Sequence, residues 1–75
     1  MSKHMTDREI AIRAVEAIKR KCHDRGVSIE EELNRVGLAR QAYYSWKHMD
    51  GIPSVYALQG MAACGYDVIK ILRGY

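Results

Sequence analysis

The segment from residue 26 to residue 53, GVSIEEELNRVGLARQAYYSWKHMDGIP, constrains the fold more than any other part of the chain. Apolar side chains recur with a helical period on both sides of Gly37. Glycine supplies the backbone freedom that a tight turn between helices requires. The segment therefore predicts two short helices joined by a tight turn, the second covering about residues 40–48.

An amphipathic helix from about residue 6 to about residue 24 is expected before this segment. Thr6 and Glu9 have capping-box spacing, and apolar residues follow them at a helical period. Gly26 is expected to end this helix. Residues 1–5 are then a flexible N-terminal arm, and the folded domain is assigned to residues 6–75.

Two further helices are expected after the segment. Pro53 and Ser54 open the first of them, Gly65 ends it, and Asp67 caps a short last helix. The side chains expected to point inward from the first are Val55, Leu58, Met61 and Ala62. Because no segment shows the alternation of a strand, the expected fold class is all-α, with five short helices.

Charge is unevenly distributed in this chain of 75 residues, whose 12 Lys and Arg and 9 Asp and Glu give a net charge of +3. No carboxylate occurs between Leu33 and Met49, although Arg35, Arg40 and Lys47 lie there. Such segregation favours a surface that faces phosphates, and ordinary solvated helix faces are the alternative. No apolar run approaches the roughly 20 residues of a membrane span, so we expect a cytoplasmic protein.

The order of these elements resembles the Cro/C1-type helix-turn-helix family, the DNA-binding domain of phage repressors and many small bacterial regulators. The matching stretches are GVS at 26–28, VGL at 36–38, the pair Tyr43 and Trp46, Pro53-Ser54, GYDVI at 65–69 and ILRG at 71–74. The resemblance implies a compact, five-helix, lambda-repressor-like domain whose second and third helices form the helix-turn-helix.

The resemblance also implies which residues contact DNA. Those expected to read bases are Arg40, Gln41, Tyr44 and Ser45. Those expected to contact the DNA backbone are Ser28, Arg35, Lys47, His48 and Ser54. Arginine pairs with guanine and glutamine with adenine through two hydrogen bonds, each pair discriminating by ~1–3 kcal/mol.

Three positions depart from the family pattern. Ile29 stands where a glutamine is common, and Ala39 replaces the usual Ser or Thr cap at a cost of roughly 1 kcal/mol. Glu32 occupies a usually apolar position, so the helix is expected to shift until Leu33 fills the core.

The function that the resemblance implies is a sequence-specific regulator of transcription, of the phage or mobile-element repressor type, that binds double-stranded DNA as a homodimer. The expected dimer surface consists of Val68, Ile71, Leu72 and Tyr75. The alternative is a protein-interaction module on the same scaffold, such as an antitoxin or a small phage-encoded inhibitor of a host protein.

Other chemistries have weaker support in the sequence. Four possible zinc ligands match no compact zinc pattern: Cys22, His23, His48 and Cys64. Tyr43, Tyr44 and Trp46 suggest a stacking platform for single strands, but the spacing of Tyr43 and Trp46 favours core packing. We therefore expect no enzyme activity, metal, cofactor or small-molecule ligand.

Overall fold

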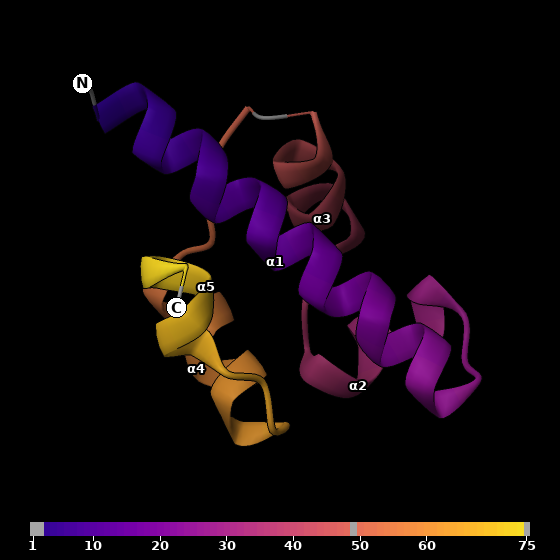
Figure 1. The fold of residues 1–75 in the computed structure, drawn as a ribbon. Coiled ribbons are helices and arrows are strands. Elements are labelled where there is room, and N and C mark those ends of the chain that lie inside the picture. Colours follow the sequence, from indigo (N-terminus) through magenta and orange to yellow (C-terminus); the bar gives the residue numbers. More distant parts are fainter. Residues whose placement is uncertain (1–2, 49, 75) are drawn as a thin grey trace.

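The computed structural model describes residues 3–48 and 50–74, with side chains from residue 7 onward. This part of the chain contains five helices and no strand (Figure 1), which confirms the all-α class. The helices are α1 (Lys3–Arg25), α2 (Ile29–Val36), α3 (Arg40–Lys47), α4 (Val55–Ala63) and α5 (Val68–Arg73). None of these helices is both long and apolar enough to cross a membrane.

The N-terminal boundary differs from the expected one, because α1 begins at Lys3 rather than near Thr6. Residues 3–5 of the expected flexible arm therefore belong to this helix, whereas residues 1 and 2 lie outside the described residues. Because α1 continues through Thr6, this residue is inside the helix and is not its N-cap, so the expected capping box of Thr6 and Glu9 is wrong.

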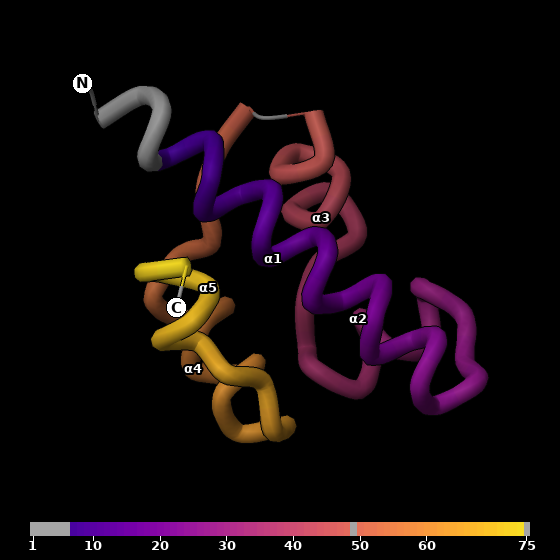
Figure 2. The backbone as a smooth tube through the Cα atoms, in the orientation of Figure 1, coloured from indigo at the N-terminus to yellow at the C-terminus, as the bar shows by residue number. Residues whose placement is uncertain are grey.

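α1 is the central element, because it packs against α2, α3 and α5, while α4 contacts α2 and α5. Figure 2 shows the chain returning after α4 so that α5 lies beside α1. The buried stripe of α1 is the expected one: Ile10, Ala11, Ala14, Val15, Ile18 and Cys22. These side chains meet Leu33, Tyr43, Trp46, Met61 and Ile71 in one core.

The turn between α2 and α3 has the geometry that its glycine predicts. Gly37 is left-handed, with φ 86°, and the amides of Gly37 and Leu38 both donate to the carbonyl oxygen of Leu33 at 2.9 Å. Both bonds satisfy the same carbonyl group, which the end of a helix would otherwise leave free. The turn that leads from α2 to α3 is thus fixed by local hydrogen bonds.

The inward face of α4 differs from the expected one. Met61 is buried as expected and Leu58 is half-buried, but Val55 and Ala62 are exposed and Ala57 is buried instead. Successive residues are 100° apart on a helix, so the buried stripe lies about one position away from the expected stripe.

The orientation of α4 depends on a close approach to α2 at Gly60. A Cβ atom at this position would lie 2.8 Å from the carbonyl oxygen of Val36, closer than real Cβ contacts allow. α4 can therefore turn this side toward α2 only because residue 60 has no side chain. The apolar pattern of α4 does not contain this information, which explains the incorrect inward assignment.

α5 contributes more to the core than expected. Ile71 is buried and Val68 packs against the core, so neither side chain is free to form the expected dimer surface. Leu72 is exposed, as is the neighbouring Ile69. Tyr75 lies outside the described residues.

Candidate nucleic-acid interface

One side of α3 is exposed and rich in hydrogen-bonding side chains. We call it the outer face of α3, and it consists of Arg40, Gln41, Tyr44, Lys47 and His48. Residues spaced by four and seven positions share one side of a helix, so these five side chains form a continuous surface. The opposite side carries Tyr43 and Trp46, both buried, which anchor α3. As expected, these two aromatic rings are core residues and not a stacking platform.

Tyr44 lies at the middle of the outer face. Its side chain is 41% exposed, and its ring meets the buried ring of Tyr43 edge to face, with centroids 5.3 Å apart. The ammonium group of Lys47 lies 5.7 Å from the centroid of the Tyr44 ring. A cation over an aromatic face is an attractive arrangement, so the two side chains support each other at this position.

Arg40 forms an ion pair that joins α3 to α2. Its guanidinium contacts the carboxylate of Glu30, in the first turn of α2. Both side chains are well exposed, and ion pairs of this kind contribute ~0–1 kcal/mol. The pair therefore restricts Arg40 without preventing it from reaching another acceptor.

The start of α2 is less suited to phosphate than expected. Ser28 is its N-cap, as expected: the hydroxyl accepts from the amide of Glu31, whose carboxylate accepts from the amide of Ser28 at 2.9 Å. Carboxylates also occupy positions 30 and 32. Negative charge stabilises a helix start but repels phosphate, so this end of α2 is already satisfied.

The start of α4 has a different character. Ser54 is the N-cap and accepts from the amide of Ala57, and the first turn of α4 has no acidic residue. Its remaining free amides and the positive end of the helix dipole are compatible with a phosphate. Of the two serines expected at the DNA backbone, Ser54 is thus the better placed.

Two other expected contact residues are partly engaged within the protein. Ser45 is only half-exposed, and its backbone carbonyl accepts a hydrogen bond from the amide of Asp50 at 2.8 Å. The guanidinium of Arg35 points to Glu32, with Nη2 to Oε2 at 2.7 Å and Nε to Oε1 at 3.1 Å. Arg35 is therefore largely neutralised and is a weaker phosphate ligand than expected.

Sequence reasoning missed the role of Glu32. Leu33 fills the core as expected, but Glu32 is buried beside it with 0% exposure. Its carboxylate accepts a 2.6 Å hydrogen bond from the hydroxyl of Tyr66 in addition to those from Arg35, and Arg25 Nε lies 3.7 Å away. An acidic residue at an inward position signals that buried donors are needed, and Arg35, one helical turn on, was a visible candidate.

We call Glu32, Tyr66, Arg35 and Arg25 the Glu32 cluster. Contacts within this cluster shift the pKa values of Glu32 and Tyr66. The hydrogen bonds from Arg35 are the main cause of a lowered pKa at Glu32, and burial opposes them. Burial, with the hydrogen bond to Glu32, raises the pKa of Tyr66. Perturbed groups also mark active sites, but here the Glu32 carboxylate is fully buried and satisfied by its donors, so the cluster joins α2 to the segment between α4 and α5.

The described residues place no three His, Cys, Asp or Glu side chains close enough to hold a metal ion. Cys22 is buried and burial raises the pKa of its thiol, whereas Cys64 is half-buried on another helix end. A buried thiol with a raised pKa is a poor nucleophile. Cys22 is thus a core residue of the fold, and Cys64 packs against the core.

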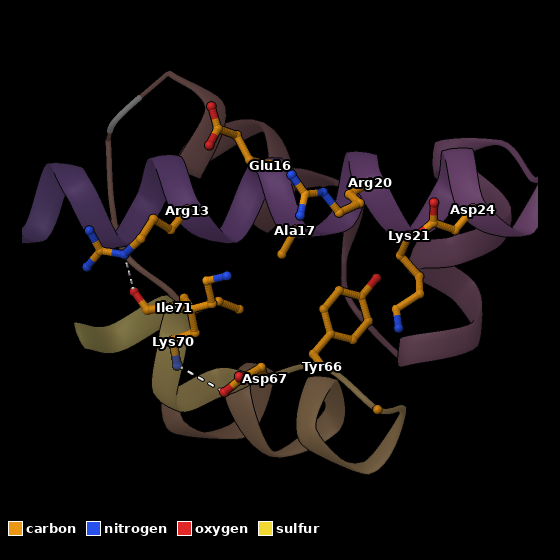
Figure 3. Close-up of a pocket in the computed structure, with 11 residues that line it drawn as sticks. Arg13, Glu16, Ala17, Arg20, Lys21, Asp24, Tyr66, Asp67, Lys70 and Ile71 are labelled. Atoms are coloured by element: carbon orange, nitrogen blue, oxygen red, sulfur yellow. Dashed lines mark hydrogen bonds between the residues drawn. The ribbon is translucent and has the colours of Figure 1, made fainter. Parts of the chain in front are cut away.

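An open groove of about 350 Å³ lies between α1 and the α4–α5 connection (Figure 3). Its lining includes Ala17, Tyr66 and Ile71, and its charged residues have both signs. Several of its polar groups are engaged: Arg13 donates to the Ile71 carbonyl, and the Lys21 ammonium lies 5.0 Å from the centroid of the Tyr66 ring. We assign no ligand to this groove.

Comparisons of the chain with protein-family models, with curated proteins and with solved structures gave no match. The function is therefore argued from the outer face of α3 and its surroundings. That face offers donors, acceptors and positive charge and has no carboxylate of its own. This chemistry matches base edges and phosphates.

Proposed function

We propose that the protein binds double-stranded DNA in a sequence-specific manner by placing the outer face of α3 in the major groove. The observation that carries this proposal is the division of α3 into an aromatic side buried in the core and an exposed side with five polar or aromatic residues. A major groove accommodates one α-helix, and its base edges are read by side chains of this type.

The residues of the outer face have different proposed roles. Arg40 and Gln41, in the first turn of α3, read base edges. Tyr44 contacts a thymine methyl group or a phosphate, and Lys47 and His48 neutralise the DNA backbone. Ser54 and the start of α4 present amides to a further phosphate.

The wider assignment follows from the resemblance of the sequence. α2, the turn at Gly37 and α3 correspond to the proposed helix-turn-helix of a Cro/C1-type regulator. One helix reads only a few base pairs, so two copies on a near-palindromic site would provide useful specificity. The proposed biological role is a regulator of transcription of the phage or mobile-element type.

The test is selection of bound duplexes from a random DNA pool, followed by affinity measurements on the enriched site at several salt concentrations. Arg40→Ala should weaken binding to the selected site by about fivefold to more than a hundredfold, which corresponds to a lost guanine contact of ~1–3 kcal/mol. Arg20→Ala, at an exposed arginine of α1, is the control and should have a much smaller effect. Circular dichroism should show the same helix content in both variants.

Wild-type protein that retains no duplex at low salt would overturn the proposal. Equal affinities of Arg40→Ala and wild type for the selected site would remove the assignment of Arg40 while leaving DNA binding in place.

A protein-interaction module remains the second candidate, and the ion pair between Glu30 and Arg40 favours it, because it gives this part of the surface both signs of charge. Salt distinguishes the two functions. Binding through several phosphate contacts weakens steeply as salt rises, whereas a protein contact centred on Tyr44 weakens little.

A further inference from the structure

The solvent side of α4 is apolar, which is unusual for an exposed helix. We call this side the outer face of α4, and it consists of Val55, Tyr56, Gln59, Ala62 and Ala63. Tyr56 is 84% exposed and Val55 66% exposed, and Ile52, just before the helix, is also exposed. The inner side of α4 is apolar as well, with Ala57 and Met61 buried. A helix that is apolar all round is normally covered on every side.

The same region lacks charge altogether. Residues 51–66 contain no Asp, Glu, Lys or Arg, although the chain has 21 such residues among 75. A partner of strongly acidic or basic character would find no complementary group on this face. A neutral apolar surface suits it, and a second copy of the same face is such a surface.

The arrangement of large and small side chains on this face is self-complementary. Val55 and Tyr56 lie at the start of α4, Ala62 and Ala63 lie at its end, and Gln59 lies halfway between them. If two copies of α4 pack antiparallel about a two-fold axis at Gln59, Tyr56 covers the partner's Ala62. Val55 then covers the partner's Ala63. The two Gln59 amides meet at the axis, where each can donate to and accept from the other.

We propose that the outer face of α4 is a homodimer interface in which two copies of α4 pack antiparallel about Gln59. This inference deepens the two-copy part of the proposed function, and it replaces the expected α5 surface, in which Ile71 is buried and Val68 packs against the core. A nine-residue helix is only about 13 Å long, so the contact is smaller than the ~800 Å² per partner of a standard interface. The dimer is therefore weak and forms reversibly as the concentration rises.

The test is sedimentation equilibrium without DNA, at protein concentrations from about 10 μM to about 1 mM. Weak association is measured in this range. The wild-type protein should shift from monomer to dimer across this range. Gln59→Glu should stay monomeric, because it places two carboxylates together at the axis. Ile69→Glu is the matched control, because Ile69 is an apolar residue of α5 that is 57% exposed. This variant should dimerise like the wild type.

A second variant places a chemical probe on the axis. Gln59→Cys should form a disulfide-linked dimer when reductant is removed, since a residue on a two-fold axis lies next to its own copy. The wild-type protein, with its native cysteines, is the control and should remain uncrosslinked.

Wild-type protein that is monomeric at about 1 mM, or Gln59→Glu that dimerises as wild type does, would overturn the interface. A monomeric wild type would mean that this face either binds a different protein or stays exposed to solvent. Neither result would affect the proposal that one copy binds DNA, because DNA takes no part in this test.

Discussion

The hydrogen bond between Tyr66 and Glu32 should have a measurable share in stability, and Tyr66→Phe tests it. The change removes only the hydroxyl that donates to the buried carboxylate at 2.6 Å. Hydrogen bonds to charged groups contribute ~1.5–3 kcal/mol. Because Arg35 still donates twice to Glu32, the carboxylate is not left unpaired, and we expect the lower part of that range.

A loss of about 1.5–2 kcal/mol corresponds to a decrease in Tm of roughly 6–16 °C for a domain of this size. Urea unfolding, followed by circular dichroism and by the fluorescence of Trp46, measures the free energy of unfolding. Glu32→Gln and the double variant complete a double-mutant cycle, which should give a coupling energy of about 1 kcal/mol or more between the two residues.

The argument fails if Tyr66→Phe unfolds within ~0.5 kcal/mol of the wild type. Purely additive effects of Tyr66→Phe and Glu32→Gln would also contradict it. In either case the buried contact would be accommodated by the fold without stabilising it.

Three other predictions follow from single features of the structure. Arg35 lowers the pKa of Glu32 in the folded protein, so the stability that this carboxylate contributes is complete above the pKa of about 4.3 that it has in the unfolded chain. This stability is lost as the pH falls through the lower pKa of the folded state. The Tm of the wild type should therefore fall more steeply below about pH 4 than that of Glu32→Gln. Gly60→Ala should reduce the free energy of unfolding by about 1–2 kcal/mol, because the new Cβ would overlap the Val36 carbonyl. Alanine is the better helix former, so a variant more stable than the wild type would refute the close approach. Ala39→Ser should raise the urea midpoint by the equivalent of ~1 kcal/mol, since residue 39 has the extended conformation of an N-cap but its side chain cannot cap α3. An unchanged midpoint would show that the amides in the first turn of α3 need no cap.

Local signals explain which parts of the fold could be predicted from the sequence. Ser28, Ser54 and Asp67 cap helices as expected, and Gly37 makes the expected turn, because each acts on residues within one helical turn of itself. The split of α3 into Tyr43 inside and Tyr44 outside was likewise visible in the helical period.

Contacts between distant segments account for what the sequence did not reveal. Glu32 meets Tyr66 34 residues later, and a chain read in order offers no sign of that pairing. The rotation of α4 depends on the contact between Gly60 and Val36, and the burial of Ile71 depends on α1. For the candidate site, the types of residue on α3 were predictable, but the pairing of Arg40 with Glu30 required the relative placement of two helices.

The attachment of α5 to α1 has a consequence for how the domain folds. The guanidinium of Arg13 donates to the carbonyls of Ile71 at 2.6 Å and Leu72 at 3.2 Å, across 58 and 59 residues of chain. Closing a loop of that length costs roughly 4 kcal/mol in chain entropy, and a six-residue helix does not persist alone in water. The six residues of α5 therefore hold their helical structure only as part of the assembled domain, because the contact with α1 has to offset both costs.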